Sequence, residues 1–248
     1  MSENRIVYRK PPVIEAICQL KLARHSKWTP ATAGQLWEEL EPDYPLDIEE
    51  QQGVQASLTL TQSGLQSSLE PQTKRVIFRN KDRNKAAVLG PDVVSTNGLP
   101  EYQGWDDLLE RLKLAFDVYG RVVDHAARAA VVSLRYVNHI RIPHSSVNTD
   151  DYFRLPVVAA YGSDAEVAGY VMRSETHLVN SGTSVSIGFG TMDSGSMESS
   201  FLLDIDVKRS IPADYPIQKV WDIADELHTI ENTQFENSIT PLARELFR

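Results

Sequence analysis

One alternating stretch near the middle of the chain, residues 131–142, most constrains what this sequence can fold into. Apolar side chains occupy one parity of the stretch, namely Val132, Leu134, Tyr136, Ile140 and Ile142. Basic side chains occupy the other parity, namely Arg135, His139 and Arg141. Because successive side chains of a strand point to opposite faces, the pattern predicts a long half-buried strand with a basic outer face. We expect Leu134, Tyr136 and Ile140 to be buried.

The same alternation recurs along the chain and predicts further strands, separated by turn residues such as Ser63-Gly64 and Asn97-Gly98. In chain order these strands cover residues 13–22, 54–61, 65–69, 75–79, 86–89, 93–96, 168–178, 185–189 and 201–208. The pieces between 54 and 96 are expected to continue as one meander. Residues 82–85 are expected to form a polar hairpin tip, and residues 193–196 a flexible loop.

Apolar residues at 3.6-residue spacing predict two long amphipathic helices. The first covers residues 105–123, with Asp106 and Asp107 in the first turn, where the helix dipole favours negative charge. The second begins near 217 and continues or restarts beyond 235, with Pro241 indicating a break. Thr29-Pro30 and Thr149-Asp150 predict the starts of two shorter helices.

The predicted order is strand, helix, several strands, helix, and it occurs twice, once in residues 1–128 and once in residues 129–248. This order predicts an α+β fold in which a mostly antiparallel sheet carries its helices on one face. Two repeated halves packed as one unit give an arrangement similar to TATA-binding-protein-like or helix-grip folds. Such a likeness of fold carries no function with it.

Composition excludes several classes of function. A net charge of −9 over 248 residues disfavours nucleic-acid binding, which usually needs a basic surface. The only cysteine, Cys18, falls on an apolar parity, so a buried and inert thiol is favoured over a nucleophile. No apolar run approaches the about 20 residues of a membrane helix, and the charged start of the chain has no signal core. We therefore expect a cytoplasmic protein without membrane contact.

Motifs for catalysis are missing from the sequence. The six histidines include no His-x-x-x-His pair, and neither a phosphate-binding glycine loop nor a Gly-x-Ser-x-Gly elbow occurs. Asp204-x-Asp206 puts two carboxylates on one strand face, although no third metal ligand lies nearby in sequence. The sequence therefore favours a non-enzymatic protein with no cofactor and no metal.

The polar alternates of the strands supply the candidate binding residues, which are Glu15, Gln19, Arg135, His139, Arg141, Asp204 and Asp206. If the first strands of the two halves are neighbours, Glu15 lies within reach of Arg135 or His139. These residues form either a set of exposed cross-strand ion pairs or a polar binding platform. The hairpin at residues 74–85 is a second cationic cluster, formed by Lys74, Arg75, Arg79, Lys81, Arg83 and Lys85. It suits either an ordinary exposed hairpin or contact with an acidic partner.

Four segments carry a resemblance to a known family. They are Pro-Pro-Val-Ile-Glu-Ala at 11–16, Tyr-Gln-Gly-Trp at 102–105, Leu-Arg-Tyr-Val-Asn-His-Ile at 134–140, and the phenylalanine-containing close at 235–247. Together they resemble a sporadically distributed bacterial family of about this length, which has no established activity. The patchy distribution implies carriage on mobile elements, which is typical of phage-defence and toxin–antitoxin modules.

Two hypotheses of function result. The first is a binding or interaction protein, a component of such a module, that uses an open polar sheet face for a protein partner or for self-association. The second is a sensor or enzyme for a nucleotide or metabolite, with a pocket between sheet and helices. In the second case Arg135, His139 and Glu15 would contact a small anionic ligand.

Overall fold

The computed structural model describes the backbone and side chains of residues 8–51, 74–156, 169–193, 197–212 and 214–248, and the backbone alone of residues 54–61 and 64–71. The strands are β1 Val13–Leu22, β2 Glu49–Gln51, β3 Val54–Thr61, β4 Gly64–Pro71, β5 Arg75–Arg79, β6 Lys85–Gly90, β7 Val93–Gly98, β8 Ala129–Ile142, β9 Val171–Leu178, β10 Thr183–Met192 and β11 Ser199–Ser210. The helices are α1 Pro30–Leu40, α2 Trp105–Val122, α3 Thr149–Tyr152, α4 Ile217–Ser238 and α5 Pro241–Glu245.

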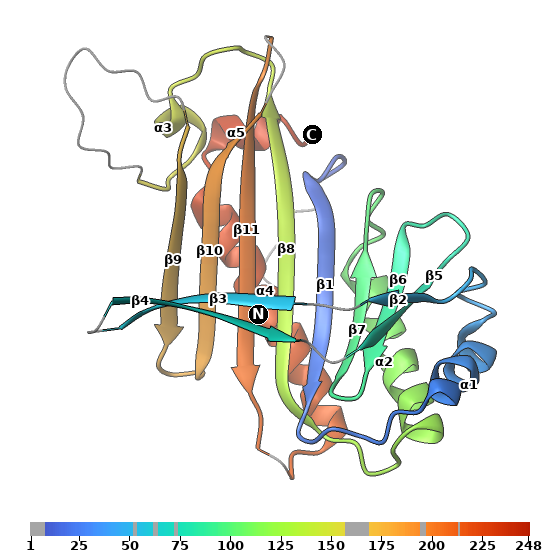
Figure 1. Cartoon of the computed structure of the whole chain (residues 1–248). Coiled ribbons are helices and arrows are strands. Elements are labelled where there is room, and N and C mark those ends of the chain that lie inside the picture. Colours follow the sequence, from blue (N-terminus) through green and yellow to red (C-terminus); the bar gives the residue numbers. More distant parts are fainter. Residues whose placement is uncertain are drawn as a thin grey trace. The chain divides into compact units, whose positions relative to one another are not determined.

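The fold is α+β, and its main element is an open antiparallel sheet of nine strands (Figure 1). The strand order is β2-β5-β6-β7-β1-β8-β11-β10-β9, so the first strand of the chain lies between β7 and β8. The strands β3 and β4 pair only with each other and form a separate two-stranded sheet.

The chain divides into two compact units. The first comprises the described residues of Met1–Ala16, Ser133–Ser210 and Trp221–Arg248, and the second comprises those of Ile17–Val132 and Ile211–Val220. Because β1 and β8 each contribute residues to both units, the division cuts across these two strands.

In the first unit, α4 runs along one face of the sheet, behind β8, β11 and β10 (Figure 1). The apolar side chains of β8 and β11 are buried, among them Leu134, Tyr136 and Ile140 of β8, as predicted. Phe153, Phe189 and Phe201 stack near one end of the sheet, with ring centroids 4.6 to 5.9 Å apart. Burial of these large side chains stabilises the unit.

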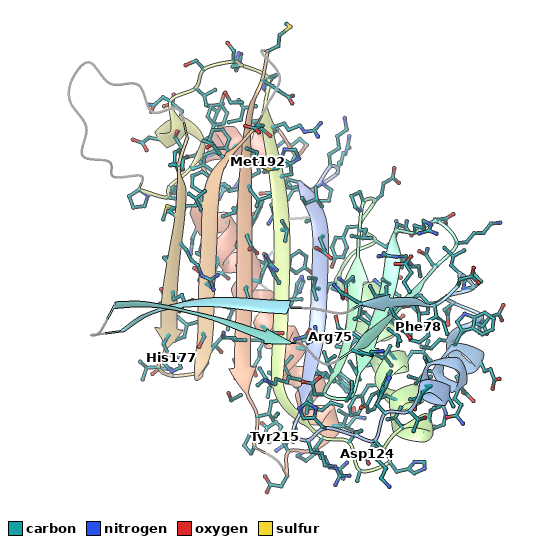
Figure 2. The ribbon with its side chains drawn as sticks, viewed as in Figure 1. Arg75, Phe78, Asp124, His177, Met192 and Tyr215 are labelled. Carbon is teal, nitrogen blue, oxygen red and sulfur yellow. The ribbon has the colours of Figure 1, made fainter. Side chains whose placement is uncertain are left out.

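In the second unit, α2 packs on β6 and β7, and α1 packs on α2 and β5. The helix α1 begins with Pro30 after Thr29, whose backbone N–H donates to Thr32 Oγ1 at 3.0 Å. The core of this unit is built from large side chains on those elements, among them Leu36, Leu108 and Tyr119. Phe78 of β5 belongs to the same core (Figure 2).

The predicted elements occur at the predicted places, including the α+β class, the long helix α2 and the break before Pro241. Two predictions need correction. The meander is confirmed only for β5, β6 and β7, because β3 and β4 leave the main sheet. The sequence pattern also missed β2, which is only three residues long. Ala168 and residues 194–196 of the predicted strand and loop lie outside the described residues. The repeat of residues 1–128 in 129–248 stays a prediction.

Candidate functional site

The face of the first unit's sheet opposite α4 carries the polar parity of β8, β11, β10 and β9. The registers of β10 with its two neighbours arrange the polar residues in three rows across β11, β10 and β9. The rows are Asp204–Gly188–Arg173, Asp206–Ser186–Glu175 and Lys208–Ser184–His177. Small residues therefore line the middle strand, and ionisable residues line the strands on both sides.

A hollow of about 200 Å³ lies over the second and third rows. We call it the β10 trough, and it is lined by Glu175, Thr176, His177, Ser184, Val185, Ser186, Asp206 and Lys208. Its floor contains the hydroxyls of Ser184 and Ser186 because β10 has no bulky side chain at these positions. His177 lies near the end of β9 (Figure 2), where its Nδ1 is 3.5 Å from Ser184 Oγ.

Arg135 and Asp204 form a bidentate ion pair beside the trough. Arg135 Nε donates to Asp204 Oδ1 at 2.8 Å, and Nη2 donates to Oδ2 at 2.7 Å. Hydrogen bonding to Asp204 raises the pKa of Arg135, and the charges of Asp206 and Glu15 act in the same direction. Asp204, Asp206 and Glu15 therefore all act electrostatically on Arg135.

Asp206 is the acidic wall of the trough. Burial raises the pKa of its carboxyl above the ordinary value, although the neighbouring cations Lys208, Arg135 and Arg173 oppose this effect. A half-buried carboxyl of this kind accepts hydrogen bonds from a cationic or hydroxylated group more strongly than an exposed one does.

The remaining predicted residues are His139, Arg141 and Gln19. His139 Nε2 is 2.5 Å from Ser200 Oγ, and burial lowers the pKa of the imidazole, as does the charge of Arg141. Arg141 is exposed near the end of β8. Gln19 is half-buried on β1 and belongs to the second unit. Among the described residues no group of three or more His, Cys, Asp or Glu side chains has an arrangement that could hold a metal ion.

Sequence reasoning missed Arg173 and Glu175, which form an exposed ion pair at 3.0 Å on β9. Arg173, Glu175 and His177 occupy every second position of β9, and this spacing could have indicated a shared polar face. In contrast, the basic hairpin at 74–85 is largely neutralised by acidic partners. Arg79 and Arg83 both pair with Glu49, at 3.1 and 3.3 Å, and Lys85 pairs with Asp107.

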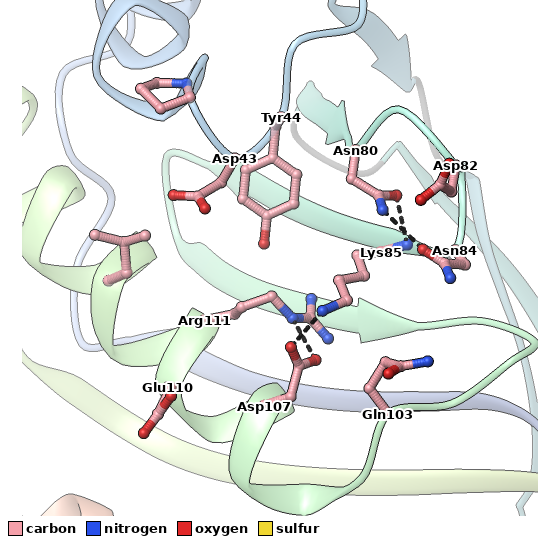
Figure 3. A pocket seen from close by; sticks show the side chains of 12 residues that line it. Asp43, Tyr44, Asn80, Asp82, Asn84, Lys85, Gln103, Asp107, Glu110 and Arg111 are labelled. Carbon is pink, nitrogen blue, oxygen red and sulfur yellow. Dashed lines mark hydrogen bonds and ion pairs between the residues drawn. The ribbon is translucent and has the colours of Figure 1, made fainter.

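A larger pocket of about 620 Å³ lies within the second unit (Figure 3). It is lined by Pro42, Asp43, Tyr44, Asn80, Asp82, Asn84, Lys85, Gln103, Asp107, Glu110, Arg111 and Leu114. Asp107 joins Lys85 to Arg111, whose Nε donates to Asp107 Oδ2 at 2.9 Å. Although burial raises the pKa of Asp107, the hydrogen bonds from Lys85 and Arg111 outweigh this effect and lower it.

Two polar atoms at the floor of this pocket, Tyr44 Oη and Arg111 Nη2, are buried and have no hydrogen-bond partner among the described residues. Burial raises the pKa of the Tyr44 hydroxyl, and the guanidinium of Arg111 opposes this. Each buried polar group without a partner costs about 1–3 kcal/mol. An oxygen that accepted from both groups would recover that cost.

No protein-family model matches the chain, and no curated protein is significantly similar to it in sequence. Within the described residues, no helix has the length and apolar character needed to cross a lipid bilayer.

Proposed function

We propose that the chain is a binding protein that holds a protein partner on the β10 trough. The observation that carries this proposal is the trough itself, in which serine hydroxyls are flanked by Asp206, Lys208 and Glu175. Charges of both signs within one hollow favour a partner with a complementary pattern, because misplaced like charges cost several kcal/mol. They disfavour nucleic acid, whose phosphates need a uniformly basic surface.

Two variants test the trough. Lys208→Glu reverses an exposed charge on its wall, and Ser186→Tyr fills its floor without changing charge. Each tagged variant is used to capture proteins from cells, beside the wild type and the control Arg121→Glu, which reverses an equally exposed charge of the other unit. A protein retained by the wild type and the control but lost by both trough variants supports the proposal. Identical captured sets for all four proteins would contradict it.

The resemblance of the four sequence segments extends this proposal. We infer that the chain belongs to the sporadically distributed bacterial family and acts in a phage-defence or toxin–antitoxin module. The partner would then be the product of a neighbouring gene. Phage plating on cells with and without the gene pair tests this, and equal plating efficiency for every phage, together with no toxicity of either gene alone, would contradict it.

We also propose that residues 1–128 and 129–248 are structural repeats of a TATA-binding-protein-like or helix-grip-like fold. The support is that each half begins with a long strand, β1 or β8, and later carries a long helix, α2 or α4. Superposition of the two halves tests the repeat. Helices that fall on opposite sides of the superposed strands would rule it out.

A second candidate function is the binding of a small metabolite, and it is supported by the unpartnered Tyr44 Oη and Arg111 Nη2 in the larger pocket. The exposed acidic residues Asp43, Asp82 and Glu110 form the rim of that pocket, and the cations lie deeper. A metabolite with a carboxylate and an amino group suits this arrangement better than a nucleotide, whose phosphates would meet the acidic rim.

Thermal unfolding in the presence of amino acids, nucleotides and sugars tests the metabolite hypothesis, because a ligand that binds the folded state raises the melting temperature. Tyr44→Phe should abolish the shift, because it removes the hydroxyl that would donate to the ligand. Tyr119→Phe is the matched control, because that hydroxyl donates to the Pro91 carbonyl at 3.2 Å away from this pocket. If no compound raises the melting temperature, the metabolite hypothesis is wrong and water is the partner of both groups.

A further inference from the structure

The strand β9 ends the nine-stranded sheet, and its outer edge is unpaired within the described part of the chain. It is eight residues long, and all but two of its residues are exposed. At the opposite end of the sheet, β2 has only three residues, which is a common way of blunting an edge. Neither proline nor lysine, two residues that commonly protect edge strands, occurs in β9. A long uncapped edge of this kind can pair with another strand.

The direction of the backbone groups determines which residues of β9 face that edge. In an antiparallel pair, residues alternate between those that bond to the neighbour and those that bond away from it. Tyr170, just before β9, accepts from the Thr191 N–H of β10 at 3.0 Å, so the even-numbered residues bond inward. The N–H and C=O groups of Val171, Arg173, Glu175 and His177 therefore point to the open edge.

The charges of β9 favour one register for antiparallel pairing with the β9 strand of a second copy. Antiparallel pairing centred on Ser174 places Arg173 of one copy opposite Glu175 of the other, and the reverse pair follows by symmetry. A shift by two residues would instead oppose Arg173 to Arg173 or Glu175 to Glu175, which is destabilising. A shift by one residue would place the polar side chains of one copy on the opposite face of the joined sheet. The sequence Arg-Ser-Glu is thus self-complementary in a single register.

We propose that a second copy of this chain pairs with β9, antiparallel and centred on Ser174, to form a symmetric dimer with a continuous sheet. Arg173 and Glu175, which pair with each other at 3.0 Å within one chain, exchange partners between the two copies. Pairing also places Val171, which is 86% exposed, opposite the ring of His177 of the other copy. The dimer uses the sheet edge, and it shares Glu175 and His177 with the lining of the trough.

The expected dimer is weak, because a single pair of edge strands buries less surface than the about 1,200 Å² of a stable interface. Its formation should therefore depend on concentration in the micromolar to millimolar range. Sedimentation equilibrium of the full chain over that range measures the association constant directly.

Charge reversal provides the decisive test. Arg173→Glu and Glu175→Arg each place like charges opposite each other twice, and each should lower the association constant about tenfold or more. The double variant restores both pairs and should dimerise like the wild type. An equimolar mixture of the two single variants should form a heterodimer, because one chain then carries two acids and the other two bases. Arg121→Glu, which breaks an exposed pair with Glu39 in the other unit, should leave dimerisation unchanged.

Several results would overturn the inference. One is a wild type that stays monomeric at the highest concentration. Another is a dimer that both single variants retain, and a third is a mixture of single variants that associates no better than either alone. Circular dichroism of each variant confirms that these exposed substitutions leave the fold intact. Loss of the trough's partner would not affect any of these measurements.

Discussion

Glu231 should make the protein less stable as the pH rises through neutrality. Its side chain lies on the buried face of α4, at helical spacing from Leu227 and Phe235, and is only 3% exposed. Burial raises the pKa of its carboxyl from 4.5 to about 8. Since the folded state binds this proton more tightly than the unfolded state, its stabilising effect is complete below pH 4.5 and is lost as the pH rises to about 8.

The magnitude follows from the linkage between protonation and folding. Between the two pKa values, stability should fall by about 1.4 kcal/mol per pH unit. Glu231→Gln keeps the shape of the protonated side chain and cannot ionise. At pH 7 the variant should therefore exceed the wild type by about 3 kcal/mol, whereas near pH 4.5 the two should be nearly equal.

Urea unfolding of the wild type and Glu231→Gln from pH 5 to pH 8.5 measures this difference, and all other titrating groups cancel in the comparison. Asp222→Asn, an exposed substitution on the same helix, should follow the wild type at every pH. If the free energies of the wild type and Glu231→Gln ran parallel across the range, the carboxyl would not be held neutral by burial and the reasoning would be refuted.

Three further predictions concern the sheet. Replacing Arg135 and Asp204 singly and together by alanine should give a coupling energy of about 0.2–1 kcal/mol in urea unfolding, because the Arg135 side chain is 47% exposed. A coupling energy above about 2 kcal/mol would mean that the pair is effectively buried. Asn138→Ala should lower the stability by about 1–3 kcal/mol in thermal unfolding, since the buried amide donates to the Leu203 carbonyl at 3.2 Å, and an unchanged melting temperature would count against that bond. Native Cys18 should not react with thiol reagents until urea unfolds the chain, because its side chain is fully buried; prompt labelling without urea would show that β1 opens.

Local pattern was sufficient for most of the elements. The alternation at 131–142 predicted β8 and its buried side, and the 3.6-residue spacing predicted α2. The pattern could not distinguish the sheet to which a strand belongs. The hairpin of β3 and β4 alternates like β5 to β7 and yet pairs only with itself. Pairing partners depend on contacts between distant residues, which a single sequence does not display.

The site shows the same limit. The alternation of the sequence predicted that Arg135 and Asp204 lie on polar strand faces. Their ion pair forms because β8 and β11 are neighbours, which the sequence did not indicate. The trough depends on Ser184 and Ser186 of β10, whose small size was not recognised as a signal. The larger pocket combines Tyr44 with α2 and the β5–β6 hairpin, and no short motif links these segments.

The central position of β1 has a consequence for how the chain folds during synthesis. This strand is complete at Leu22, yet its neighbours are β7 and β8, and β8 ends roughly 120 residues later at Ile142. At about 5–20 residues per second, a ribosome needs roughly 6–24 s to deliver that second partner. Until then at least one edge of β1 has no strand to pair with. Such long-range pairing gives a high contact order, so we expect slow folding that is completed only after β8 has left the ribosome.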